Sequence, residues 1–265
     1  MSDRVTIEVS AGVADVRLSR PDKLNALDAA MFHGIVEAAE TVAADPSVRV
    51  VVLSGEGRGF CAGLDIASFL GDGGGDFSIL GGRSDGRIAN VAQQVAHAWT
   101  ELAVPVIAAV HGVAFGGGIQ IALGADIRIV APDARLSVME IRWGLLPDMT
   151  GLQTLPRLVG LDVAKELAFT GRQFSGTEAK ELGVATRLAD DPRAEALELA
   201  ATIAGKNPMA IRGIKALLNA SGTRPLAESY KEETRLMTGV IGSPNQLEAV
   251  AAELEGRPAT FVDPT

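Results

Sequence analysis

The feature that most constrains this fold is an apolar run, Val106–Val110, followed closely by the glycine triplet Gly116–Gly118. Five apolar residues in succession predict a strand that is buried on both faces. The apolar segment after the triplet predicts a helix, and a helix that begins at glycine presents unpaired backbone N–H groups without a Cβ atom in the way. The segment therefore predicts either a site for an anion or oxyanion, or simply close packing of strand on helix.

Strand and helix patterns alternate from the start of the chain to Val130. Alternating apolar and polar residues predict a hairpin between Val5 and Leu18. A helix capped by Asp28 should follow, then a buried strand over Val48 to Leu53 and a helix over Ile88 to Leu102. This alternation predicts an α/β core.

Two glycine-rich segments interrupt the pattern. The first, Gly55 to Asp65, follows a predicted strand and opens a short helix at Asp65, so it is either a structural turn or a ligand-binding loop. The second, Gly71 to Gly86, holds seven glycines. It predicts a mobile loop, acting as a pocket lid or forming a plain surface insertion.

The pattern becomes helical after Gly151. Pro192 and Pro208 stand where first-turn prolines belong, the second behind a capping asparagine. Further helices are expected over Pro225 to Val240 and Pro244 to Leu254. We therefore divide the chain into an α/β core, residues 1–190, and a helical region, residues 191–265, that docks within or between subunits.

Composition excludes several classes of function. The net charge of -9 and pI near 4.9 argue against nucleic acid or an anionic membrane as partner. No apolar run reaches the roughly 20 residues of a membrane span, and the first residues do not resemble a signal peptide, so we expect a cytoplasmic protein. Cys61 is the only cysteine and the three histidines are scattered, so neither an intrachain disulfide nor a metal site is expected.

Three polar residues near the glycine triplet carry the candidate chemistry. Glu140 has mostly apolar neighbours, so its carboxylate is either paired or desolvated with a raised pKa suited to proton transfer. Asp148 follows a proline in a glycine-bounded loop, where a turn or helix cap is the ordinary role of aspartate. Gln120 can form hydrogen bonds but cannot exchange a proton. Trp143 could line the same pocket or cover its outside.

At this point the motifs resemble a known family. FCAGLD (Phe60 to Asp65), PVIAAVHGVAFGGG (Pro105 to Gly118) and ADIRIVAPDA (Ala125 to Ala134) are similar to those of the crotonases, whose best-known members are enoyl-CoA hydratases and isomerases. The resemblance extends from LSRPDKLNAL (Leu18 to Leu27) through the C-terminal helices. It implies a crotonase fold, a spiral of ββα units followed by a helical C-terminal region.

The resemblance also implies an acyl-CoA substrate. The thioester carbonyl would accept hydrogen bonds from two backbone N–H groups, which fall at Leu64 and Gly117 by motif position, and which would stabilise an enolate-like intermediate. The positions that line the CoA channel are Lys23, Ala62, Asp65 and Ile66. CoA then enters as part of the substrate, and no separate cofactor is expected.

Branches of the family differ in their acid and base. Hydratases carry two glutamates, at the positions of Gln120 and Glu140, so the amide here weakens the case for hydration. The segment EIRWGLLPDMTGLQTLP (Glu140 to Pro156) is similar to that of the dienoyl-CoA isomerases, in which a glutamate and an aspartate eight residues later shuttle protons. Those isomerases carry an aspartate where this chain has Gln120.

The resemblance therefore implies a double-bond isomerase with Glu140 and Asp148 as catalytic residues and Gln120 among the substrate-binding residues. Hydration of a trans-2-enoyl-CoA is the main alternative reaction, and a related reaction such as hydrolysis is another. A third alternative, from a different class of function, is a protein that binds acyl-CoA without catalysis. The family further implies fatty acid β-oxidation and a homotrimer or dimer of trimers, with residues 191–265 serving trimerisation and completion of the active site.

Overall fold

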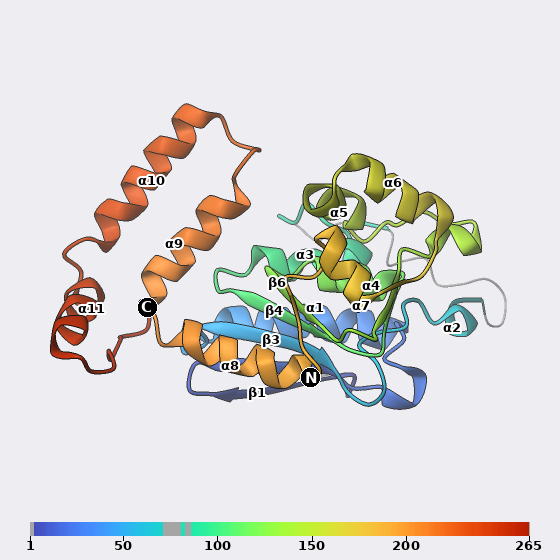
Figure 1. Ribbon diagram of the computed structural model, residues 1–265, viewed down its shortest axis with the longest axis horizontal. Coiled ribbons are helices and arrows are strands. Elements are labelled where there is room, and N and C mark those ends of the chain that lie inside the picture. Colours follow the sequence, from blue (N-terminus) through green and yellow to red (C-terminus); the bar gives the residue numbers. More distant parts are fainter. Residues whose placement is uncertain (1–2, 71–80, 83–85, 265) are drawn as a thin grey trace.

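A six-stranded sheet forms the centre of the computed structural model, which describes residues 3–70, 81–82 and 86–264 (Figure 1). The predicted loop from Gly71 to Gly86 lies almost wholly outside these residues. The strand order is β1-β2-β3-β4-β6-β9, with β1 antiparallel to β2 and all other neighbours parallel. These strands are β1 (Val5–Ser10), β2 (Val13–Leu18), β3 (Val50–Gly55), β4 (Val106–Val110), β6 (Ile127–Val130) and β9 (Arg187–Leu188).

Successive residues of the central strands face two different hydrophobic cores. In β3, Val51 and Leu53 belong to the larger core, while Val50 and Val52 belong to the smaller one. This is the side-chain alternation of any strand, and burial on both faces explains why these strands read as continuous apolar runs. Helices α1 (Ala29–Ala44), α3 (Val91–Glu101) and α4 (Gly117–Leu123) contribute to the larger core, and α8 (Pro192–Ala204) covers the other face.

Two helices begin at the capping residues that the sequence predicts. Asp28 caps α1 by accepting a hydrogen bond from Met31 N at 2.8 Å. Asn207 caps α9. The helices are α1 (Ala29–Ala44), α2 (Ile66–Leu70), α3 (Val91–Glu101), α4 (Gly117–Leu123), α5 (Gly151–Val159), α6 (Leu161–Thr170), α7 (Gly176–Leu182), α8 (Pro192–Ala204), α9 (Pro208–Asn219), α10 (Leu226–Val240) and α11 (Pro244–Glu255). Two 3₁₀ turns occupy Pro21–Lys23 and Glu140–Trp143.

A second, three-stranded sheet stands beside α4. It consists of β5 (Val113–Phe115), β7 (Arg135–Ser137) and β8 (Phe174–Ser175), in the order β5-β7-β8. β5 leads directly into the glycine triplet, and β7 leads toward the turn that carries Glu140. This small sheet therefore sets the relative position of the two segments that carry the candidate chemistry.

The last three helices, α9 to α11, project from the body on the side away from α2 (Figure 1). α8, which begins just after the predicted boundary at residue 190, packs on the sheet through Ala196, Ala200 and Ala204. The arm proper is therefore α9 to α11. In the described part of the chain, no helix is both long and apolar enough to cross a membrane.

Candidate active site

The site forms where the two glycine-rich loops run side by side. Cys61 N donates to Val113 O at 3.0 Å, and Phe115 N donates to Cys61 O at 3.0 Å. These bonds make a short parallel pairing between the segment after β3 and strand β5. As a result, two stretches that are about fifty residues apart in the sequence share one edge of the same cavity.

Gly63 permits this close approach. Its φ of +82° is in the left-handed region, and a Cβ atom there would lie 2.4 Å from Phe115 O and 3.4 Å from Gly117 N. The contact brings the backbone of Leu64 beside that of Gly117. Within the described residues, neither the Leu64 N–H nor the Gly117 N–H has an acceptor. The pair can therefore donate two hydrogen bonds to one oxygen of a ligand.

Leu64 and Gly117 both line a cavity of about 510 Å³. Most of its wall is apolar. Three polar side chains also line it: Gln120 from α4, Glu140 from the second 3₁₀ turn, and Asp148 from the loop before α5. An apolar cavity with a few convergent polar groups is typical of a site for a small molecule.

Glu140 is the more deeply buried of the two carboxylates, at 9% exposure. Its Oε1 accepts a hydrogen bond from Gln120 Nε2 at 2.6 Å, whereas its Oε2 has no partner among the described residues. Burial raises the pKa of Glu140, a hydrogen bond from Gln120 partly opposes this rise, and the charge of Asp148 adds to it. Such a carboxyl group is suited to exchanging a proton near neutral pH.

Asp148 lines the same cavity but is exposed to solvent. Desolvation by the surrounding protein raises its pKa, although water screens the effect at an exposed carboxylate. The residue at the capping position of α5 is Thr150, so Asp148 does not cap that helix. Its side chain makes no hydrogen bond to another described residue, which leaves it available to a ligand.

Gln120 connects the two carboxylate-bearing segments. It is 1% exposed, and its Oε1 accepts hydrogen bonds from Met149 N and Gly151 N, each at 3.0 Å. Both oxygen lone pairs are therefore occupied, while one N–H is given to Glu140. The structure accordingly places Gln120 between Glu140 and the loop that carries Asp148. Its predicted part in substrate binding stays a prediction.

Most of the site residues predicted from the sequence share this cavity, and two do not. The ones that line it are Ala62, Leu64, Ile66, Gly117, Gln120, Glu140 and Asp148. Lys23 is exposed on the first 3₁₀ turn and Asp65 forms an ion pair with Arg20 at 2.8 Å. Burial acts to raise the pKa of Asp65, but its hydrogen bonds outweigh this and lower the pKa overall.

Several lining residues were not singled out from the sequence. They are Phe32, Phe69, Ala92, Met139, Leu145, Leu146 and Met149. Phe32 packs edge-on against Phe69 with ring centroids 6.1 Å apart, so a residue that reads as helix core also forms cavity wall. From the sequence, Trp143 could line the pocket or cover its outside; in the structure it lines the cavity. Leu145 and Leu146 could have been identified as cavity residues from the sequence, because they are large apolar residues in an irregular segment between two carboxylates.

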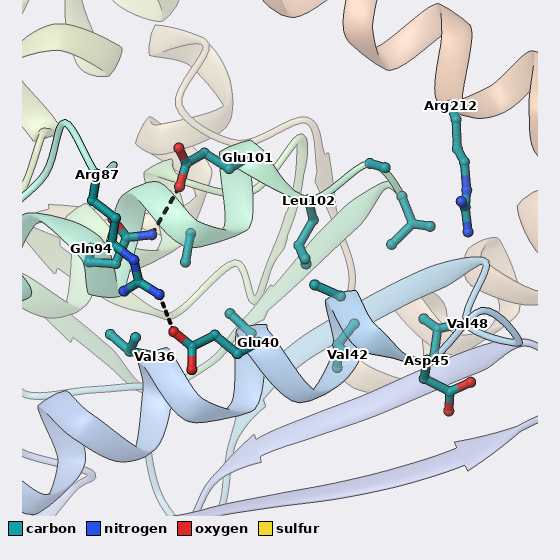
Figure 2. Close-up of a pocket in the computed structure, with 15 residues that line it drawn as sticks. Val36, Glu40, Val42, Asp45, Val48, Arg87, Gln94, Glu101, Leu102 and Arg212 are labelled. Atoms are coloured by element: carbon teal, nitrogen blue, oxygen red, sulfur yellow. Dashed lines mark hydrogen bonds and ion pairs between the residues drawn. The ribbon is translucent and has the colours of Figure 1, made fainter. Parts of the chain in front are cut away.

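A second cavity, of about 380 Å³, lies between α1 and α3 (Figure 2). It contains the Glu40 and Arg87 ion pair, and Gln94 Nε2 donates to Glu101 Oε2 at 2.9 Å. None of the predicted site residues lines this second cavity, so we assign the chemistry to the first cavity. The described ranges hold no group of three or more metal-ligating side chains.

Comparison with known proteins agrees with this geometry. Residues 8–264 match the model of the enoyl-CoA hydratase/isomerase family. The chain is 33% identical to a probable enoyl-CoA hydratase of Bacillus subtilis (97% of this chain, 98% of that protein). It is also 33% identical to the peroxisomal Delta(3,5)-Delta(2,4)-dienoyl-CoA isomerase of Arabidopsis thaliana (92% and 90%).

Solved structures give the same result. The crystal structure of an enoyl-CoA hydratase from Bacillus anthracis superposes with a TM-score of 0.88 at 29% identity, covering 97% of this chain and 98% of the other. The fold, the paired glycine-rich loops and the family match all lead to one assignment: this chain belongs to the enoyl-CoA hydratase/isomerase, or crotonase, family of acyl-CoA enzymes.

Proposed function

We propose that this protein shifts a double bond of a dienoyl- or enoyl-CoA by proton transfer between Glu140 and Asp148. The observation that carries the proposal is the set of side chains around one apolar cavity. Two carboxyl groups with raised pKa values line it, and the third polar residue, Gln120, has its oxygen fully occupied by backbone donors.

In this reaction the thioester carbonyl oxygen accepts hydrogen bonds from Leu64 N–H and Gly117 N–H. One carboxylate removes a proton from a carbon conjugated with the thioester, and the electron pair moves into an extended enolate. The two N–H groups stabilise the charge that develops on the oxygen. The other carboxyl group then donates a proton at the far end of the conjugated system, so the double bonds move and no atom is gained or lost. CoA takes part only as a portion of the substrate.

Hydration of a trans-2-enoyl-CoA is the second candidate, because relatives such as the Bacillus subtilis protein carry that name. Addition of water needs groups that hold and activate the water molecule. Gln120 is poorly suited to this, since its oxygen already accepts two backbone hydrogen bonds. Isomerisation needs only the two carboxyl groups and the pair of N–H donors, and we therefore favour it.

The test is an ultraviolet assay on a 3,5-dienoyl-CoA and a trans-2-enoyl-CoA, with the wild-type protein, Asp148→Asn and Glu140→Gln. Asp190→Asn, a change at an exposed aspartate that does not line the cavity, serves as the matched control. We expect conversion of the diene to be lost in both site variants and retained in the control. Hydration of the enoyl-CoA that survives Asp148→Asn would replace the proposal with a hydratase. Tight acyl-CoA binding without any turnover would indicate a binding protein.

We also propose that copies of this chain associate through the arm, as a homotrimer or dimer of trimers. Large apolar side chains stand exposed along α10 and α11: Leu226, Tyr230, Met237, Leu247, Val250 and Leu254. Covering them would remove a considerable apolar surface from water. Sedimentation velocity of the wild type and of the double variant Tyr230→Ser/Leu247→Ser measures the mass of the particle in solution. A monomeric wild type would contradict the proposal. A role in β-oxidation and a cytoplasmic location remain predictions.

A further inference from the structure

Gln120 occupies an unusual position for a buried amide, because it bonds to both segments that carry the candidate acid and base. Its oxygen accepts from Met149 N and Gly151 N, the two backbone groups that flank Thr150, whose φ is +70°. Its nitrogen donates to Glu140 Oε1 at 2.6 Å. The orientation of the amide is thereby determined: a flipped side chain would set its NH₂ group against two N–H donors.

We infer that Gln120 is a positioning residue that occupies Oε1 of Glu140 and so reserves Oε2 as the oxygen that exchanges the proton. Oε2 is buried and has no hydrogen-bond partner among the described residues, which is costly for a carboxylate unless a ligand supplies the partner. The same amide fixes the backbone immediately after Asp148. This inference deepens the proposed function, since it gives Glu140 a defined proton-transferring atom.

A second observation points to the same role. A Cβ atom on Gly151 would lie 2.8 Å from both Cγ and Oε1 of Gln120, so glycine at this position leaves room for the amide. The backbone of Gly151 has an ordinary helical conformation as the first residue of α5. Glycine is therefore required here by the neighbouring side chain and not by its own torsion angles.

The inference predicts an order of Glu140 pKa values. The amide donor stabilises the ionised carboxylate, so its removal in Gln120→Met should raise the pKa of Glu140. Gln120→Glu keeps an acceptor for the two backbone donors but places a second carboxylate against Oε1, and the pair must then share a proton. We expect a further rise, to about one pH unit or more above the wild type. Gly151→Ala should act in the direction of Gln120→Met by displacing the amide.

The experiment is a ¹³C NMR titration of the full-length protein labelled at its glutamate carboxyl carbons, with the Glu140 signal identified by its loss in Glu140→Gln. The pH profile of kcat/KM for the diene is recorded in parallel. Gln94→Met is the matched control, because Gln94 is also a buried glutamine but lines the second cavity (Figure 2). It should leave both readouts unchanged.

The expected result is a midpoint that rises from wild type to Gln120→Met to Gln120→Glu, with the acidic limb of the kcat/KM profile moving in the same order. Equal midpoints in the three proteins, whatever happens to stability or kcat, would overturn the inference and leave Gln120 a purely structural residue. If the wild type does not convert the diene, the proposed function fails, while the NMR titration still decides the role of Gln120.

Discussion

Replacement of Gly63 by alanine should move the two N–H groups of the oxyanion-binding pair, those of Leu64 and Gly117, apart from each other. Gly63 has φ of +82°, and its Cβ position lies 2.4 Å from Phe115 O. A carbonyl cannot remain at that distance from a methyl group, so Phe115 must move. Because Phe115 N donates to Cys61 O, the pairing of the two loops should loosen, and the Leu64 and Gly117 N–H groups should no longer converge on one oxygen.

The size of the effect follows from these contacts. An alanine in the left-handed region costs about 1–2 kcal/mol, and weakening one backbone hydrogen bond costs about 1 kcal/mol. We therefore expect Gly63→Ala to lose about 2–3 kcal/mol of unfolding free energy, which a domain of this size should tolerate. Misplacing one oxyanion donor should reduce kcat by about 10²–10³-fold.

Urea unfolding and the diene assay measure the two quantities on the same preparations. Gly222→Ala is the matched control, because its φ is +76° but a Cβ atom there meets no atom of the described residues within 4 Å. It should carry only the backbone cost of about 1–2 kcal/mol and keep its turnover. If Gly63→Ala is folded and turns over substrate as fast as Gly222→Ala, the two N–H groups do not act as the oxyanion site.

Three further predictions concern buried ionisable groups. Lys215 is 7% exposed, forms an ion pair with Asp126 at 2.8 Å and donates to two backbone carbonyls. Lys215→Met should therefore lower the free energy of unfolding by about 3 kcal/mol. An unchanged urea midpoint would contradict this. Because burial raises the pKa of Glu140, the protonated form of this side chain stabilises the folded state, and the wild type should lose stability relative to Glu140→Gln as the pH rises through that pKa. Urea unfolding of both proteins at several pH values measures this, and a difference in unfolding free energy that stays constant with pH would contradict it. Burial raises the pKa of Cys61 to about 12, so a thiol reagent at pH 8 should label it only in denaturant, and rapid labelling of the folded protein would refute its burial.

Much of the framework follows from local sequence signals. The apolar run Val106–Val110 became β4 with those same bounds, and Asp28 and Asn207 cap helices as predicted. The periodicity of a strand and the chemistry of a cap involve neighbours within a few residues, so they can be read without knowing the rest of the fold. The spaced glycine motifs likewise indicated the family, which the comparisons show.

The polar side chains of the cavity were candidates from the sequence, but their arrangement and much of the apolar wall were not. Glu140, Asp148 and Gln120 were candidates from their neighbours and from the family motifs, whereas Lys23 and Asp65 were expected beside the ligand and do not line the cavity. Whether Asp148 is a turn residue or a cavity residue was likewise open, because a proline and a nearby glycine fit both.

What the sequence by itself determined is therefore the main strands and helices of the α/β core and the family, because short-range periodicity and motif spacing encode them. The small sheet of β5, β7 and β8 was not predicted. Only the tertiary structure decided that Gln120 gives its nitrogen to Glu140 and its oxygen to the backbone after Asp148, across separations of 20 to 31 residues. It also decided that Oε2 of Glu140 is the oxygen without a partner among the described residues. These hydrogen bonds depend on the packing of loops that are far apart in the sequence, so a local sequence pattern cannot predict them.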